Sequence, residues 1–265
     1  LPRRRAAAPL RAAAAPWRWA PPRRRAPRRR GRLPVVFQRP PYSTLPVFLL
    51  RLLHLNVGLV VYGLAIALMV RGSAVGLGPW DVFHQGLSLI TPLSFGQGMI
   101  LAGLVVMLFA ALVAKVKIGI GTVLNMLLIG VWTDAFLKLL PAPQGLAASL
   151  PYFGAGLLVL GVATGLYLTA GLGAGPRDGF VIGLARMTRL SVRAARTLVE
   201  VLVLTSGWLM GGSVGVGTLV IALAVGPLMQ FSMRLFRPLE QRYDAADARA
   251  RAVAVTARGA GAGRG

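Results

Sequence analysis

Two aspartates follow the same glycine- and proline-rich turn at distant places in this chain. The turn Gly-Leu-Gly-Pro-Trp-Asp ends at Asp81, and the turn Gly-Ala-Gly-Pro-Arg-Asp ends at Asp178. A proline at the first position of a helix places each aspartate in the first helical turn, where a carboxylate complements the helix dipole by about 0.3–1 kcal/mol. Carboxylates at membrane depth are costly and usually functional, so the pair also qualifies as ligands for a cation or a proton. Both interpretations stay open.

Charged residues in the second half of the chain add to this set. Trp80, which precedes Asp81, is replaced by Arg177 in the second turn, so a site shared by the two turns would not be symmetric. Glu200 lies in an apolar stretch, and Arg196 precedes it by one helical turn on the same face. The spacing predicts an ion pair inside a helix bundle. The alternative is a protonatable Glu200 that couples proton movement to transport.

The remaining titratable groups argue against catalysis and metal binding. His84 follows Asp81 closely, and we interpret it as a satisfied interior histidine, with a proton relay as the alternative. The chain has no cysteine and no paired ligand spacing, so we expect no metal and no cofactor. No nucleophile occurs with a base and an orienting partner, and the glycine-rich turns lack the lysine of a phosphate-binding loop. We therefore expect no enzymatic activity.

The two turns belong to a longer internal repeat. Residues 76–94 match residues 173–191 at ten of 19 positions, all at an offset of 97. A second block, Gly-Ile-Gly-Thr at 119–122, returns as Gly-Val-Gly-Thr at 215–218. The sequence therefore predicts two copies of one unit, an arrangement in which many transporters place their working site between the copies.

The composition of the chain is typical of a membrane protein. Of the 265 residues 55% are apolar and 14% are charged, and the mean hydropathy is +0.66. These values are typical of a chain with several transmembrane helices, because about 20 apolar residues are needed to cross a hydrocarbon layer of about 30 Å. We therefore predict an all-α membrane protein.

The net charge of +23 comes largely from the N-terminal region. Residues 1–45 hold 13 of the 27 arginines, interleaved with proline and alanine, and contain no recognisable nucleic-acid module. We interpret this region as a disordered tail that contacts anionic membrane lipids, and we expect no nucleic-acid partner. Because the first methionine is Met69, we also hypothesise that part of the tail reflects an over-extended gene model, which mass spectrometry of the native N-terminus would test.

The distribution of basic residues predicts the topology. Apolar spans are expected at 46–70, 97–114, 118–140, 151–170, 191–210 and 214–235, with short segments at 79–91 and 176–188. If the short segments do not cross, the N-terminus, Lys115, the arginines from 177 to 196 and the C-terminus all face the cytoplasm. The sequence thus predicts six transmembrane helices in a bacterial inner membrane, as a 3+3 inverted repeat with both termini cytoplasmic.

The same interpretation gives the domain boundaries. Repeat 1 covers 46–140, a linker covers 141–150, repeat 2 covers 151–236, and an Arg/Ala/Gly-rich cytoplasmic tail covers 237–265. Each short segment is either re-entrant or interfacial. Irregular backbone at membrane depth must be buried in protein or line a watery cavity, so we expect the two turns to meet inside the bundle.

The paired turns and the glycine-threonine blocks resemble those of the YczE/YyaS/YitT family of bacterial integral membrane proteins. The resemblance rests on residues 76–81, 121–122, 175–179 and 211–218, and covers about 46–237. It implies a multi-pass inner-membrane protein from a family whose members mostly lack an assigned activity.

These observations favour a secondary transporter or channel-like permease for an unidentified small solute or ion. The candidate site residues are Asp81, Asp178, Arg177, Trp80, His84, Arg196 and Glu200, and the residues that shape the turns are Gly76, Gly78, Pro79, Gly173, Gly175 and Pro176. The alternative is a non-transporting membrane scaffold or accessory protein in which these groups serve only packing. The sequence predicts neither the substrate nor the oligomeric state.

Overall fold

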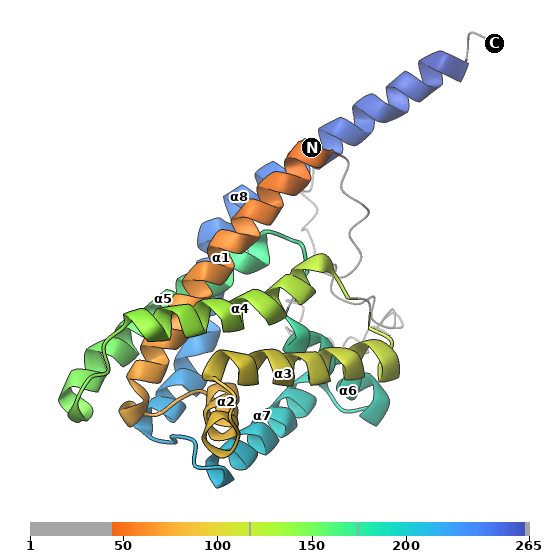
Figure 1. Ribbon diagram of the computed structural model, residues 1–265. Coiled ribbons are helices and arrows are strands. Elements are labelled where there is room, and N and C mark those ends of the chain that lie inside the picture. Colours follow the sequence, from red (N-terminus) through yellow and green to blue (C-terminus); the bar gives the residue numbers. More distant parts are fainter. Residues whose placement is uncertain (1–43, 117, 174, 263–265) are drawn as a thin grey trace, which may run out of the picture. The chain divides into compact units, whose positions relative to one another are not determined.

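A computed structural model describes residues 44–116, 118–173 and 175–262, which belong to one compact unit, and all regular secondary structure in these ranges is helical. The predicted N-terminal tail lies outside the described residues, except for its last two positions. The elements shown in Figure 1 are α1 (Leu45–Arg71), η2 (Ser73–Val75), α2 (Pro79–Ile90), α3 (Phe95–Leu108), η3 (Phe109–Val113), α4 (Ile120–Leu139), α5 (Gly145–Thr169), α6 (Pro176–Thr188), α7 (Val192–Leu209) and α8 (Val216–Ala262). η2 is a 3₁₀ turn and η3 is a π-helical turn that continues α3.

Five helices in the described residues are long and apolar enough to cross a membrane. They are α1, α3 with η3, α4, α5 and the part of α8 that ends at Val253. The helix α7, which covers the span expected at 191–210, is not among them. It has 18 residues and contains Arg193, Arg196 and Glu200, which lower its hydropathy.

Local sequence signals explain where the short helices and their neighbours begin. The first residues of α2 and α6 are Pro79 and Pro176, which cost no hydrogen bond at a first helical position. The side chain of Ser94 caps α3 in a reciprocal capping box, and Ser191 caps α7.

Two helices extend beyond the spans expected from the sequence. The helix α5 begins at Gly145, so the second part of the predicted linker 141–150 is helical, and Pro151 lies inside the helix rather than at its start. The region predicted as a tail, 237–265, continues α8 as helix to Ala262. Its many alanines and arginines are strong helix formers, and the end of an apolar run marks the end of burial rather than the end of a helix.

The helices α1 and α5 pack closely and run antiparallel. Gly72, just after α1, contacts Phe153 near the start of α5, whereas Gly58 in α1 contacts Tyr167 near the end of α5. A Cβ atom at Gly58 would lie 2.7 Å from the backbone nitrogen of Tyr167, so glycine permits this approach. The helix α4 packs on α1, α8 packs on α5, and α2 packs on α7. The main core cluster includes Leu55, Leu59, Met69 and Leu77.

Each glycine-rich turn is braced by a segment from the other half of the chain. The backbone N–H of Leu77 donates to the carbonyl of Ser213 at 3.1 Å, and the N–H of Gly121 donates to the carbonyl of Leu172 at 3.1 Å. Gly76 and Gly173 have φ angles of +120° and +132°, which favour glycine. The first turn thus rests on residues just before α8, and the second rests on the start of α4.

A buried arginine connects α1 to the polar part of α8, which runs past the start of α1 in Figure 1. The guanidinium of Arg51 is 1% exposed and donates to Asp244 at 2.9 Å, to Asp247 at 3.0 Å and to the carbonyl of Ala170 at 3.1 Å. Its Cζ atom lies 5.1 Å from the centroid of the Tyr243 ring. This cluster fixes the direction in which α8 leaves the apolar core.

Candidate functional site

A cavity of about 520 Å³ lies where the two glycine-proline turns meet. Gly78 and Pro79 line it from the first turn, and Gly175 and Pro176 line it from the second. Gly76 and Gly173 precede these lining glycines by two residues. They do not line the cavity and instead contact the segments that brace the turns. The structure therefore brings the ends of the two turns together around one space.

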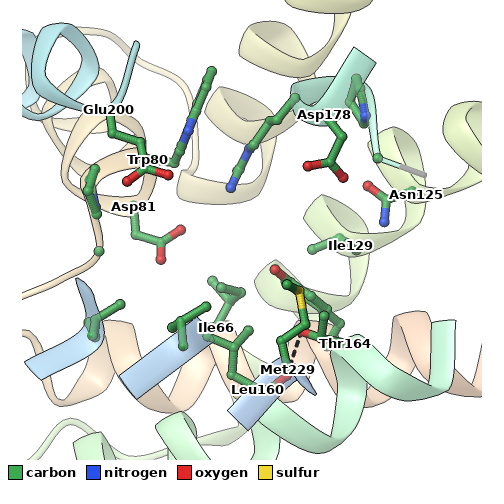
Figure 2. A pocket seen from close by; sticks show the side chains of 18 of the residues that line it. Ile66, Trp80, Asp81, Asn125, Ile129, Leu160, Thr164, Asp178, Glu200 and Met229 are labelled. Carbon is green, nitrogen blue, oxygen red and sulfur yellow. Dashed lines mark hydrogen bonds between the residues drawn. The ribbon is translucent and has the colours of Figure 1, made fainter. Parts of the chain in front are cut away.

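The two aspartates face this space from opposite sides. Asp81 and Asp178 both line the cavity, each from the first turn of its short helix, and Figure 2 shows their carboxylates on either side of the opening. Asp81 is 7% exposed, and its Oδ1 atom has no hydrogen-bond partner among the described residues. This oxygen is buried on the side of His84, so a species in the cavity would meet the remainder of the carboxylate.

Arg177 and Trp80, at matching positions of the two turns, meet across the cavity. The Cζ atom of Arg177 lies 4.7 Å from the centroid of the Trp80 ring, a cation–π distance. Within the described part of the chain Arg177 forms no ion pair with a carboxylate. The sequence predicts an asymmetric site because these two residues differ between the turns, and in the structure they are in direct contact.

The predicted ion pair between Arg196 and Glu200 is confirmed, with an Nε–Oε1 distance of 3.0 Å. Both residues line the cavity. Their side chains are 55% and 37% exposed, so the prediction that the pair is buried in the bundle interior was wrong. The reason is that α7 presents these residues at the edge of the cavity rather than in a packed interface.

His84 is an interior residue but does not line the cavity. Its Nδ1 atom is 3.8 Å from Oδ1 of Asp81, too far for a hydrogen bond, and neither ring nitrogen has a hydrogen-bond partner among the described residues. The predicted satisfied histidine is thus buried but not satisfied. The ring packs near Trp80 and Phe95, with centroid distances of 6.2 and 5.9 Å.

Burial shifts the titration of two groups on the short helices, which are outside the five candidate spans. It lowers the pKa of His84 to about 4, opposed by the neighbouring Asp81, so the ring is neutral near pH 7. It raises the pKa of Asp178 above 3.8, opposed by the positive charges of Arg196 and Arg177.

Two tyrosines complete the wall and were not predicted. Tyr62 in α1 and Tyr167 in α5 line the cavity, with ring centroids 5.7 Å apart in an edge-to-face arrangement. The sequence signal that could have indicated them is a tyrosine hydroxyl inside a long apolar span. Asn125, Thr164 and Met229 also line the cavity (Figure 2), and no group of three His, Asp or Glu that could hold a metal occurs in the described residues.

Several apolar helices around a polar-lined cavity define a membrane protein. Residues 49–234 match a family of unknown function, DUF6198, and the chain belongs to this family. It is 36% identical over 176 residues to the uncharacterized membrane protein YczE of Bacillus subtilis (strain 168), covering 66% of this chain and 82% of that protein.

Two further relatives support the same assignment. An uncharacterized protein of Haemophilus influenzae (strain ATCC 51907 / DSM 11121 / KW20 / Rd) is 34% identical over 200 residues, which cover 75% of this chain and 87% of that protein. The uncharacterized protein YyaS of Bacillus subtilis (strain 168) is 24% identical over 197 residues, which cover 73% and 96%. The resemblance to the YczE/YyaS family is thus confirmed. No solved structure matches the chain.

Proposed function

We propose that this protein is a secondary transporter or channel-like permease that binds a small solute or ion in the cavity between the two glycine-proline turns. The observation that carries the proposal is that Asp81 and Asp178, one from each turn, line a single cavity. Ionisable groups inside a membrane domain mark solute and ion pathways more often than packing sites. The proposal includes no catalytic step.

An inverted repeat explains how the cavity is built. Many lining residues occur in pairs at the offsets of the sequence repeat: Met99 and Arg196, Gly103 and Glu200, Asn125 and Ile221, Met126 and Ala222, and Ile129 and Val225. In addition, the equivalent helices α1 and α5 run antiparallel, as two copies in opposite orientations would require. Inverted repeats in transporters place the solute site at their shared interface.

In this arrangement α7 is a membrane helix in addition to the five candidate spans, and α2 and α6 are the short helices. At 1.5 Å per residue the 18 residues of α7 reach about 27 Å, close to the hydrocarbon thickness of about 30 Å. Arg196 and Glu200 line the cavity, which accounts for charges in a membrane helix. The basic loops orient both termini toward the cytoplasm of a bacterial inner membrane.

Water access to the cavity tests this proposal, and the cysteine-free chain permits the test without background labelling. Leu160→Cys places a thiol at the cavity wall, and Ala163→Cys places one on the same helix at a fully buried position that does not line the cavity. We expect a membrane-impermeant thiol reagent to label Leu160→Cys both in right-side-out and in inside-out vesicles, and to leave Ala163→Cys unlabelled in both. A scaffold without a pathway predicts no labelling of either variant, and that result would overturn the proposal.

A further inference from the structure

We propose that the solute is a zwitterion, a molecule with both an ammonium and an anionic group, whose ammonium binds Asp81 and whose anionic group binds Arg177. This inference rests on the proposed function and adds the chemical class of the solute.

Asp81 supplies the negative half of the site. The residue lines the cavity and is 7% exposed, and no arginine or lysine of the described residues forms an ion pair with it. The nearest titratable neighbour, His84, is 3.8 Å away and neutral near pH 7, so it does not balance the carboxylate. An ammonium group brings both the missing charge and up to three donors, and charge-assisted hydrogen bonds are about twice as strong as neutral ones.

Arg177 supplies the positive half. The Trp80 ring covers one face of its guanidinium, and a stacked guanidinium keeps the N–H groups along its edge free to donate. No carboxylate of the described chain pairs with it, although Asp178 is its neighbour in sequence. A planar fork of donors matches a carboxylate or phosphate group in a two-bond geometry.

The two halves act on one molecule because the stack holds them in the same part of the cavity. Trp80 directly precedes Asp81 in the first turn of α2, so a guanidinium on the Trp80 ring stays beside that turn without forming an ion pair with Asp81. Asp81, Trp80 and Arg177 all line the same cavity. A solute with only one charge would leave the opposite protein group unmatched.

The other charges of the cavity do not disturb this balance. Arg196 and Glu200 pair with each other at 3.0 Å. Asp178 faces the cavity from the side opposite Asp81. Beside the first turn of α2 the cavity therefore presents the carboxylate of Asp81 and the guanidinium of Arg177, which together complement a zwitterion. The tyrosine rings Tyr62 and Tyr167 add an apolar wall, and about 520 Å³ lies within the range of about 300–1,000 Å³ typical of small-molecule sites.

Ligand-dependent thermal stabilisation of the purified full-length protein tests the inference. The probes are three matched classes: the twenty proteinogenic amino acids with glycine betaine, the amines that lack their carboxylate, and the carboxylic acids that lack their amine. We expect at least one zwitterion to raise Tm while its amine and acid counterparts at the same concentration do not. Asp81→Asn and Arg177→Gln should each weaken this binding by about tenfold to hundredfold, because each removes a charge-assisted hydrogen bond. Arg193→Gln, an exposed arginine of α7 outside the cavity, should leave it unchanged.

Other outcomes separate this inference from the proposed function. Stabilisation by an amine or an acid as strong as that by its zwitterion would overturn the zwitterion assignment and leave a solute site in the cavity. An absence of stabilisation by every probe would also overturn it. The proposed function itself fails only if Leu160→Cys is inaccessible to the impermeant reagent from both sides.

Discussion

The guanidinium carbon of Arg177 lies 4.7 Å from the ring centroid of Trp80, and the two residues occupy the same position in their respective turns. A contact of this kind is worth about 0.5–2 kcal/mol. We therefore expect Trp80→Leu and Arg177→Gln to be non-additive in thermal or denaturant unfolding, with a coupling energy of about that size. Trp208→Leu, an exposed tryptophan of α7, serves as the control and should be additive with Arg177→Gln. Additivity of the first pair would show that the stacked geometry contributes nothing.

The two aspartates that bind Arg51 should differ in their effect on stability. The side chain of Asp247 is 5% exposed and that of Asp244 is 50% exposed. Breaking a buried pair costs about 3–5 kcal/mol, whereas an exposed pair is worth about 0–1 kcal/mol. Asp247→Asn should therefore lower Tm much more than Asp244→Asn. Equal losses would mean that α8 does not hold Arg51 in the way described.

Close packing between α2 and α7 predicts a severe effect at Gly207. A Cβ atom there would lie 2.6 Å from the carbonyl carbon of Val82, inside the backbone of α2. Gly207→Ala should cost about 1–3 kcal/mol or more in the free energy of unfolding, because backbone cannot move aside as a flexible side chain can. Gly154→Ala on α5 meets no atom within 4 Å and should leave stability unchanged or slightly higher. If the two variants unfold at the same temperature, the helices do not approach as closely as described.

Asp178 should make stability depend on pH in a defined direction. Burial raises its pKa above 3.8, so between pH 3.8 and the raised value the folded chain binds the proton more tightly than the unfolded chain. In that window the free energy of unfolding falls as pH rises. Below pH 3.8 Asp178 is protonated in both the folded and the unfolded chain, so it no longer makes the free energy of unfolding depend on pH. Asp178→Asn removes the titration. The difference in unfolding free energy, native minus variant, should therefore decrease as pH rises through the window. A constant difference, or one that grows with pH, would contradict the shift.

Features encoded by short sequence patterns were predictable. The residues Pro79 and Pro176 marked the first positions of α2 and α6, and the spacing of Arg196 and Glu200 gave their ion pair. Six of the seven candidate residues line one cavity in the structure, and the seventh, His84, does not line it. Whether these residues bind a solute stays a prediction.

Features that depend on distant contacts were not predictable. Arg51 lies 193 residues from Asp244, and nothing in either local sequence indicates their ion pair. The exposure of Arg196 and Glu200 depends on how α7 is placed against the other helices, which spacing along one helix cannot show. The start of α5 was missed because Pro151 resembled a helix start, whereas it is the seventh residue of the helix, where a proline removes a backbone hydrogen bond and crowds the carbonyl four residues earlier.

The reciprocal bracing of the two turns has a consequence for synthesis of the protein. The N–H of Leu77 receives its acceptor from Ser213, which a ribosome adds only after seven of the eight helices have been made. Until then this N–H lacks the acceptor that it has in the folded protein, and a buried backbone donor without an acceptor is costly. A nascent chain that ends before residue 213 therefore leaves the first turn without its brace, so the first half reaches its final structure only after the second half has been made.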